Sequence, residues 1–169
     1  SFLSNNGEVQ NQGMELELTA NVLRTKDWKF TVSMNTAYNK NKIKDLNSAV
    51  PYYINQINNS YVTMLAKDYP INAFYGYVTD GLFQNQAEVD AHAVQPGAEP
   101  GDIRFRDLNN DGVINDSDRT VIGNPNPSWF FSMNNNLSYK GFELSVFLQG
   151  VAGNKIYNAN NIDNVGMAA

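Results

Sequence analysis

Two pairs of long segments in this chain alternate between apolar and polar residues. In the first pair, apolar residues recur at every second position from Met14 to Val22, and again over most of Trp28 to Tyr38. A period of two places successive side chains on opposite sides of an extended backbone. The pattern predicts two strands, about residues 14–25 and 29–39, which form a first hairpin within residues 1–39.

The register of this hairpin follows from pairing apolar residues with apolar residues, because a slip by one residue moves every side chain to the other face. A two-residue turn pairs Val22 with Thr31, whereas a three-residue turn pairs Val22 with Val32. We therefore predict an odd-length turn, a type I turn with a bulge. Leu23 is expected on the polar face.

The second pair of segments forms another hairpin, residues 128–151. A two-residue turn at residues 140–141 pairs Tyr139 with Phe142 and gathers the apolar residues of both strands on one face. Asn135 is the one polar member of that face, and Phe147 is the one apolar residue on the other.

These strands have the length and the aromatic margins of membrane strands. About ten residues cross a bilayer at a tilt, whereas strands of soluble sheets usually have about five or six. Trp28, Tyr139 and Phe142 flank the short turns, and Tyr38 and Trp129 lie at the opposite ends. Aromatic residues at both edges of an apolar band are typical of the two membrane interfaces. The predicted fold is all-β, an antiparallel transmembrane β-barrel segment. A soluble sandwich that buries the apolar face against a second sheet is the alternative.

A long excursion, residues 40–127, separates the hairpins, and strand parity places it on the side away from the short turns, as an extracellular loop region. Short strands are expected near 51–54 and 74–78, and a short helix over 86–93. His92 is expected to be solvated or locally bonded. Residues 152–169 begin the next extracellular loop. Candidate ligand-stacking residues are Tyr52, Tyr53, Tyr69, Tyr75 and Tyr77.

A calcium-type loop spans residues 107–118, where oxygen-bearing side chains occupy the first, third and fifth positions and Gly112 the sixth. This spacing suits Ca²⁺, a hard cation that takes oxygen ligands around a sharp glycine bend. Asp stands at the twelfth position instead of Glu, and the flanks do not predict two helices. The alternative is a turn whose side chains bond their own backbone. The candidate metal ligands are Asp107, Asn109, Asp111, the Val113 carbonyl and Asp118.

Composition narrows the function classes. The net charge of -5 and pI of about 4.7 argue against nucleic-acid binding. With no cysteine, there is neither a disulfide framework nor a thiolate metal site. We identify no signal peptide. We also identify no catalytic triad and no phosphate-binding loop, so the chain is not expected to be an enzyme. Glu15 and Glu17 share a face and suggest either paired carboxylates or, more simply, the polar lining of a lumen.

Several motifs together resemble the C-terminal barrel region of SusC/RagA-type TonB-linked outer-membrane transporters, and they cover most of the chain in order. Besides the calcium-type loop they are Gly13-Met-Glu-Leu-Glu-Leu18, Asn39-Lys-Asn-Lys-Ile43, Phe74-Tyr-Gly-Tyr-Val-Thr-Asp-Gly-Leu-Phe83, Pro100-Gly-Asp-Ile-Arg-Phe-Arg-Asp107, Ile122-Gly-Asn-Pro-Asn-Pro127 and Phe147-Leu-Gln-Gly-Val-Ala-Gly-Asn154.

This resemblance implies a larger protein, of which the chain is a fragment: a barrel of about 22 strands with an internal plug, in the outer membrane of a Gram-negative bacterium of the Bacteroidota. It implies import of oligosaccharides or peptides with a SusD-like surface lipoprotein, powered by TonB through parts absent from this chain. Outer-membrane lipid would surround the hairpins, and Ca²⁺ would have a structural role in the loop.

A second hypothesis is a soluble, secreted, calcium-dependent carbohydrate-binding or adhesion module, for which the tyrosines and the acidic loop would also suffice. The two hypotheses predict different behaviour of the chain in buffer without a membrane or detergent. Open barrel hairpins have unpaired edges and an exposed apolar face, so they are expected to aggregate in plain buffer.

Overall fold

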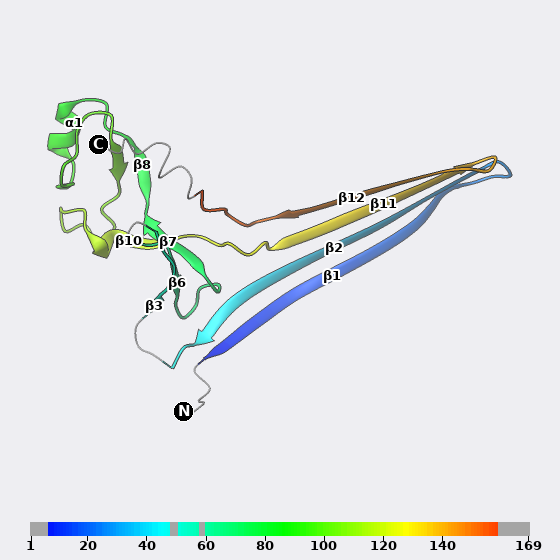
Figure 1. The fold of residues 1–169 in the computed structure, drawn as a ribbon, viewed down its shortest axis with the longest axis horizontal. Helices are drawn as coiled ribbons and strands as arrows, with labels where there is room; N and C mark the ends of the chain where they lie inside the picture. The colour runs from blue at the N-terminus through cyan, green and yellow to red at the C-terminus, as the bar shows by residue number, and fades with distance from the viewer. Residues whose placement is uncertain (1–6, 48–50, 58–59, 159–169) are drawn as a thin grey trace. The chain divides into compact units, whose positions relative to one another are not determined.

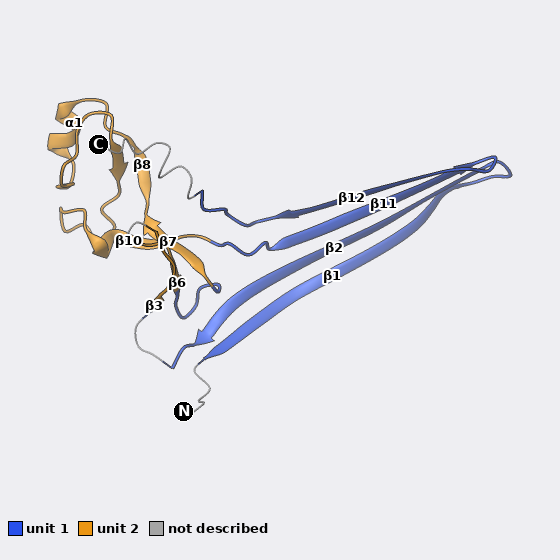
Figure 2. Cartoon of the chain, in the orientation of Figure 1, with its two compact units in different colours: residues 1–51, 65–71, 124–158 blue, residues 52–64, 72–123, 159–169 orange. Residues whose placement is uncertain are grey.

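The computed structural model describes residues 7–47, 51–57 and 60–158. The chain divides into two compact units, coloured separately in Figure 2. Unit 1 contains residues 1–51, 65–71 and 124–158, and unit 2 contains residues 52–64, 72–123 and 159–169.

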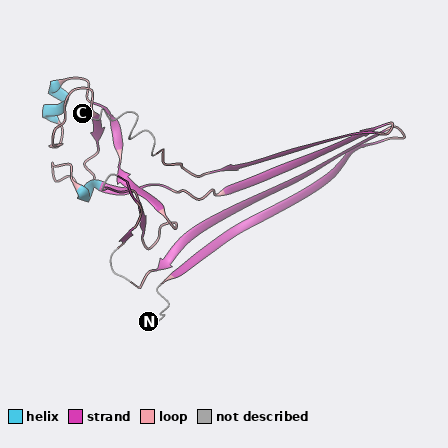
Figure 3. Ribbon diagram, viewed as in Figure 1, coloured by secondary structure: helices cyan, strands magenta, loops and turns pink. Residues whose placement is uncertain are grey.

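Unit 1 is built on a four-stranded antiparallel sheet with the order β1-β2-β11-β12 (Figures 1 and 3). Its strands are β1 (Glu8–Arg24), β2 (Trp28–Asp45), β11 (Trp129–Tyr139) and β12 (Phe142–Ala152). The antiparallel all-β class predicted from the alternating pattern is confirmed. Both strands of the first hairpin are longer than predicted, because β1 begins before residue 14 and β2 continues beyond residue 39.

The second hairpin has the predicted register. Tyr139 pairs with Phe142, and Asn135 pairs with Val146. Lys140 and Gly141 have φ values of 45° and 87°. Positive φ at both central residues defines a type I′ turn, whose twist matches that of the flanking strands.

The predicted register of the first hairpin is wrong. Thr25 N donates to Trp28 O at 2.8 Å across a two-residue turn, and Val32 pairs with Ala20 instead of Val22. A bulge between Asn21 and Leu23 absorbs the extra residue, Val22. The bulge restores apolar pairing on both of its sides. It also places Leu23 opposite Phe30, on the apolar face, contrary to the prediction.

The apolar face of the long sheet is exposed on β1 and β12 and partly exposed on β2 and β11. Leu16, Leu18 and Met34 retain 51%, 52% and 39% exposure, and Phe142 retains 79%. A sheet in a soluble sandwich would bury such residues against its partner sheet. The exposed face therefore favours the barrel-wall interpretation.

Aromatic side chains flank this face at both ends. We call Trp28, Tyr139 and Phe142 the turn-side row; the Trp28 and Tyr139 rings stack with centroids 4.1 Å apart. Tyr38 and Trp129 form the far-side pair, with centroids 4.9 Å apart.

The two short turns lie side by side, because Lys140 N donates to Asp27 O at 3.1 Å. The chain therefore leaves the sheet at Asp45 and re-enters it at Trp129, at the end away from these turns.

The segment of residues 65–71 returns to β2 within unit 1. Ile43 N donates to Tyr69 O and Asp68 N donates to Ile43 O, each at 2.9 Å. Lys42 Nζ lies 2.7 Å from the Asp68 carboxylate, and this hydrogen bond lowers the pKa of Asp68. The Ile43 side chain is buried. The excursion is thus attached to the sheet a second time.

Unit 2 consists of short elements. Its main sheet has the order β10-β7-β6-β3, and two small ladders pair β4 with β5 and β8 with β9. The bounds are β3 (Tyr52–Tyr53), β4 (Gln56–Ile57), β5 (Ser60–Tyr61), β6 (Thr63–Leu65), β7 (Ala73–Tyr77), β8 (Thr79–Leu82), α1 (Gln86–Ala91), β9 (Ile103–Phe105), the 3₁₀ turn η1 (Asp116–Asp118) and β10 (Arg119–Gly123).

The elements expected in this region are found with different bounds. β3 lies within the predicted segment 51–54, β7 overlaps 74–78, and α1 ends two residues before the predicted helix. Asn85 begins α1 by accepting a hydrogen bond from Glu88 N at 3.0 Å, as an N-cap does. Within the described residues, no helix has the length and apolar character needed to cross a membrane. The buried apolar residues of unit 2 are Val62, Met64, Ala73, Phe83 and Ile114.

Candidate functional site

The candidate metal loop, residues 107–118, connects β9 to β10 and bends around its first carboxylate. Asn110 N donates to Asp107 Oδ1 at 2.6 Å, and Gly112 N donates to Asp107 Oδ2 at 2.8 Å. Asn110 and Gly112 have positive φ values of 58° and 82°, in the left-handed region that Asn and Gly tolerate best. The sharp bend expected at Gly112 is present.

The third and fifth positions also bond within the loop. Asp111 N donates to Asn109 Oδ1 at 3.0 Å, and Val113 N donates to Asp111 Oδ1 at 2.9 Å. Asn109 Nδ2 donates to Asp111 Oδ2 at 2.9 Å. Short polar side chains that bond the backbone two residues ahead stabilise turns of this kind.

The twelfth position, Asp118, is fully buried. Its two oxygens accept hydrogen bonds from Leu108 N and Asn115 N, each at 2.9 Å. The Asn115 N–H is the largest cause that lowers the pKa of Asp118; burial opposes it, and the Leu108 N–H acts in the same direction as that of Asn115. Asp118 therefore stays ionised at neutral pH and ties the two ends of the loop together.

The loop fits a hard cation in part. The side-chain oxygens of Asp107, Asn109 and Asp111 each accept a backbone bond and retain a second acceptor position. The Val113 carbonyl occupies the seventh position, but Asp118 is already engaged by backbone amides. Across residues 7–47, 51–57 and 60–158, no group of three acidic, histidine or cysteine side chains is arranged to hold a metal. The loop is thus folded by its own hydrogen bonds, as the turn alternative requires.

A neighbouring segment fixes the loop in unit 2. Val94 forms a parallel bridge with Val113, in which Val94 N donates to Gly112 O at 2.8 Å and Ile114 N donates to Val94 O at 2.9 Å. His92 lies two residues before Val94; its Nδ1 is 2.9 Å from Ala93 O. The expectation that His92 is locally bonded is confirmed.

The predicted ligand-stacking tyrosines are partly brought together. The Tyr53 ring lies 5.0 Å from that of Tyr75, and the Arg119 guanidinium lies 4.6 Å from the Tyr75 centroid and 5.6 Å from that of Tyr77. Tyr52 is exposed on β3, and Tyr69 belongs to unit 1. Two of the five tyrosines, Tyr75 and Tyr77, therefore face the Arg119 guanidinium, and Tyr53 packs against Tyr75.

Burial makes two of these phenols weaker acids. Burial first, and a hydrogen bond with Tyr53 second, raise the pKa of Tyr75 to about 12. Burial also raises the pKa of Tyr77. Both side chains are neutral at physiological pH and present hydroxyl groups as donors and acceptors.

Arg119 was not singled out from the sequence. A signal was available, because Arg119 follows the acidic loop directly and begins a strand, where it pairs with Tyr77. The guanidinium also forms an ion pair with Asp116 at 3.6 Å.

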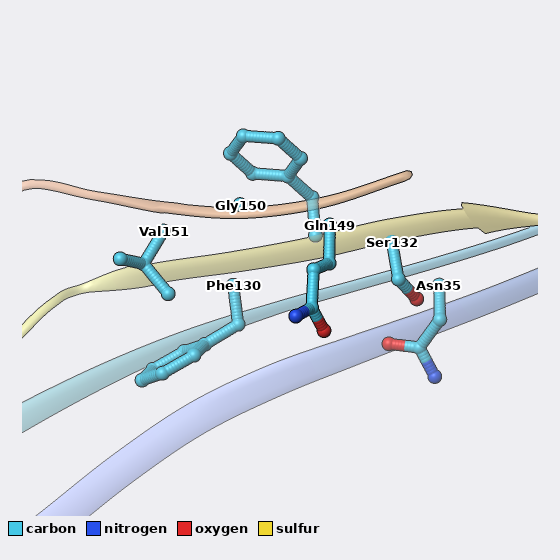
Figure 4. Close-up of a pocket in the computed structure, with 7 residues that line it drawn as sticks. Asn35, Phe130, Ser132, Gln149, Gly150 and Val151 are labelled. Carbon is cyan, nitrogen blue, oxygen red and sulfur yellow. The ribbon is translucent and has the colours of Figure 1, made fainter. Parts of the chain in front are cut away.

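The polar face of the long sheet carries hollows around Phe130. One of about 450 Å³ is lined on this face by Asn35, Phe130, Ser132, Gln149 and Val151, which point to the same side of the sheet (Figure 4). The prediction that Phe147 is the one apolar residue on the polar face of this hairpin is wrong, because Phe130 lies on the same face. The sequence contained a signal for this position. Phe130 directly follows Trp129, which is on the apolar face, so the Phe130 side chain must point to the polar face.

The sheet and its two faces define a class of protein. An antiparallel wall with an apolar exposed face, aromatic residues at both margins and a polar opposite face is the architecture of an outer-membrane β-barrel. The described residues form an open part of such a wall, not a closed barrel.

Relatives of known class are similar to this sequence. The chain is 32% identical over 160 residues to a TonB-dependent receptor of Formosa agariphila, covering 94% of this chain and 16% of the relative. It is 26% identical over 161 residues to the TonB-dependent receptor SusC of Bacteroides thetaiotaomicron, covering 90% and 15%. No family model matches the sequence. The chain belongs to the SusC/RagA family of TonB-dependent receptors.

A solved structure supports the fold. The RagAB peptide transporter superposes with a TM-score of 0.64 at 22% identity, over 88% of this chain and 16% of that chain. RagAB in the closed-closed state superposes with a TM-score of 0.63. The chain thus spans about one sixth of the length of the relatives and structures that it matches.

Proposed function

We propose that this chain supplies part of the wall and extracellular region of a TonB-dependent transporter in the outer membrane of a Gram-negative bacterium. The observation that carries the proposal is the contrast between the two faces of the sheet β1-β2-β11-β12. Leu18 and Leu148 are exposed on the apolar face, whereas Thr19 and Asn134 bond to polar neighbours on the other. Lipid and a water-filled lumen are the two solvents that suit these faces.

The height of the apolar band agrees with a bilayer. Tyr38 follows Trp28 by ten residues on β2, which is about 33 Å of strand at about 3.3 Å per residue. A strand tilted by about 40° would then span about 25 Å, which is the height of the apolar band in outer-membrane barrels. The turn-side row and the far-side pair would lie at the two interfaces.

The proposed substrate class and partners rest on the likeness to relatives. Import of oligosaccharides or peptides with a SusD-like surface lipoprotein is supported by the likeness to SusC and to RagAB, which is named as a peptide transporter. TonB would act through parts of the protein outside this chain. The excursion between Asp45 and Trp129 leaves the sheet away from the short turns, which suits an extracellular region.

The solubility of this polypeptide tests the class. In plain buffer the chain is expected to aggregate, and in detergent to remain dispersed, because the apolar face and the sheet edges need cover. Size-exclusion chromatography with light scattering measures both states. A monomer that unfolds cooperatively in buffer without detergent would instead establish the soluble carbohydrate-binding or adhesion module.

Transport is tested with the full-length receptor. Cells that express it with a SusD-like surface lipoprotein are expected to accumulate labelled substrate when TonB is intact and to lose accumulation when TonB is deleted. Co-purification of the lipoprotein with the receptor tests the partner. Uptake that is unchanged without TonB would contradict the proposal.

We propose a structural Ca²⁺ site in the loop of residues 107–118. Asp107, Asn109, Asp111 and the Val113 carbonyl are the ligands on the open side, and Asp118 closes the loop from within. A bound cation would reduce the conformational entropy of the loop and stabilise its folded form.

Limited proteolysis of the full-length receptor in calcium or in chelator tests this site. Calcium is expected to slow cleavage within residues 107–118, and Asp111→Asn to weaken that protection. Asp116→Asn is the matched control, because Asp116 is exposed and pairs with Arg119. Identical cleavage in calcium and in chelator would contradict the metal site. The loop would then be a turn held only by hydrogen bonds between its side chains and its backbone.

A further inference from the structure

Two segments of unit 2, residues 52–57 and 60–65, pair with each other and continue its main sheet next to β7. We call them the paired segments. Backbone pairing joins β6 to β7, and Tyr75 N donates to Val62 O at 2.9 Å. This hydrogen bond forms only while the paired segments are docked on β7, so it is a local measure of their docking.

The Arg119 side chain makes a second connection to the paired segments, from the other side of β7. Arg119 begins β10 opposite Tyr77. Its guanidinium lies 4.6 Å from the centroid of the Tyr75 ring, and its Nη2 donates to the Tyr61 carbonyl oxygen. A side chain of β10 thus reaches across β7 and holds a backbone group two strands away.

The candidate metal loop fixes the backbone from which this side chain extends. Arg119 N donates to Asp116 O where the loop ends in η1. The buried Asp118 carboxylate accepts hydrogen bonds from Leu108 N and Asn115 N, each at 2.9 Å. These bonds determine where β10 begins, so a change in the fold of the loop displaces the backbone of Arg119.

The ion pair between Arg119 and Asp116 adds little to this connection. The Arg119 Nη1 lies 3.6 Å from the Asp116 carboxylate, and the Asp116 side chain is 89% exposed. Solvent screens an exposed pair of this kind. The connection therefore depends on the buried contacts of the guanidinium with the Tyr75 ring and the Tyr61 carbonyl.

The stability of the sheet does not by itself explain an arginine at this position. The Arg119 side chain is only 13% exposed, and its Nε has no hydrogen-bond partner among the described residues. A buried N–H without a partner costs free energy, and an unbranched apolar side chain such as methionine would fill the same space without that cost. The guanidinium is better suited to joining two segments than to packing.

We propose that Arg119 is a positioning residue that couples the fold of the candidate metal loop to the docking of the paired segments on β7. Loosening the loop loosens the segments, and stabilising the loop holds them in place. The two states are the segments docked through the Tyr75–Val62 hydrogen bond and the segments released from it. Because the Tyr53 and Tyr61 rings lie on these segments, 5.6 Å apart, the loop sets the position of an aromatic pair outside it.

Hydrogen exchange measured by mass spectrometry on the detergent-solubilised full-length receptor tests the coupling. Asp118→Asn loosens the loop, because it removes the charge that the Leu108 and Asn115 amides stabilise. This substitution is expected to speed exchange of the Tyr75 amide about tenfold. In the Arg119→Met background it should change that rate by less than about twofold, although exchange within the loop still rises.

Arg106→Met is the matched control. Arg106 directly precedes the loop, and its ion pair with Asp80, at 3.8 Å, is exposed. In this background Asp118→Asn should still speed exchange of the Tyr75 amide about tenfold. Gly112→Ala is a second means of loosening the loop, because a φ of 82° strains any residue that has a Cβ. It should give the same pattern.

Two results would overturn the coupling. The first is faster exchange within the loop with no change at the Tyr75 amide. The second is an equal increase at the Tyr75 amide in the wild-type and Arg119→Met backgrounds, because Arg119 would then stabilise the sheet without connecting it to the loop.

This coupling requires neither transport nor a bound cation, because the loop is loosened through its own residues. Calcium that protects the loop from proteolysis and leaves exchange of the Tyr75 amide unchanged would support the metal site and contradict the coupling. An Arg119-dependent effect of Asp118→Asn, in a receptor whose loop is cleaved identically in calcium and in chelator, would support the coupling and contradict the metal site.

Discussion

Two glycines in the long sheet, Gly13 and Gly150, lie where a single added Cβ atom would clash with a neighbour. A Cβ on Gly13 would lie 2.5 Å from the Tyr38 carbonyl oxygen, which is backbone. A Cβ on Gly150 would lie 2.5 Å from the Phe131 ring, which is a side chain. The distances are equal, but a ring can rotate away and a backbone carbonyl in a ladder cannot.

Gly13→Ala is therefore expected to destabilise the folded barrel by about 1–3 kcal/mol, the usual cost of overpacking, and Gly150→Ala by less. Unfolding of the full-length receptor in guanidinium, reconstituted in lipid vesicles, measures both free energies. Equal losses for the two variants would mean that the β1–β2 spacing relaxes as easily as the Phe131 side chain does.

The candidate loop shows what residue-level reasoning reached and what it missed. The spacing of Asp107, Asn109 and Asp111 predicted a bend at Gly112, and the bend is present. It did not predict that Asp118 would be buried with both oxygens bonded to backbone amides, because that depends on where the chain returns after η1. Arg119 and its tyrosine contacts depend in the same way on strand pairing across the excursion.

At the scale of elements, the two hairpins differ in how far the sequence defines them. The second hairpin keeps its alternation on both sides of its turn apart from exceptions such as Asn135 and Phe147, so one register satisfies most of the pairs. The first contains an extra residue in one strand, and a bulge can place it at Val22 or a longer turn can absorb it. Local patterning does not distinguish these solutions, because both pair apolar residues with apolar residues.

Deleting Val22 tests the bulge. The shortened strand would place Asn21 and Leu23 opposite Thr31 and Phe30 in an uninterrupted ladder, so folding is expected to be kept. Deleting Ala20 instead would also remove the extra residue, but it would place Asn21 opposite Val32 on the apolar face and Val22 opposite Thr31 on the polar face, so assembly is expected to be weaker than in the Val22 deletion. Heat-dependent gel mobility and the amount of receptor in the outer membrane measure assembly. Loss of assembly in the Val22 deletion would show that the bulge itself is required.

The short strands of unit 2 were the least predictable elements. β3, β4 and β5 contain two residues each, which is too short for any period to be recognised. Their positions are set by partners far along the chain, as when β7 pairs with β10. The sequence therefore indicated that structure exists between the hairpins but not its topology.

At the scale of the whole molecule, β1 and β12 each have a neighbour on one side within the described sheet. Their other edges carry backbone donors and acceptors that need partners where no water is present. In the full-length receptor, further strands on both sides would satisfy these groups and close the wall. The facing of the side chains then has a directly measurable effect.

Leu18→Arg, at mid-strand on the apolar face, is expected to cost about 2–4 kcal/mol in the assembled barrel, whereas Thr19→Arg on the polar face should be tolerated. Unfolding of the reconstituted full-length receptor gives both values. If the two arginines cost the same, the faces have been assigned to the wrong solvents or the strand does not cross the membrane.

The distance between the turn-side row and the far-side pair also selects a host membrane. Tryptophan and tyrosine rings anchored in headgroup regions resist displacement toward the acyl chains. Bacterial outer membranes are thinner than average, and sterol-rich plasma membranes are several ångströms thicker. In long-chain lipids this wall would have to compress the surrounding leaflets or straighten its strands, so vesicles of short-chain lipid are its natural match for reconstitution.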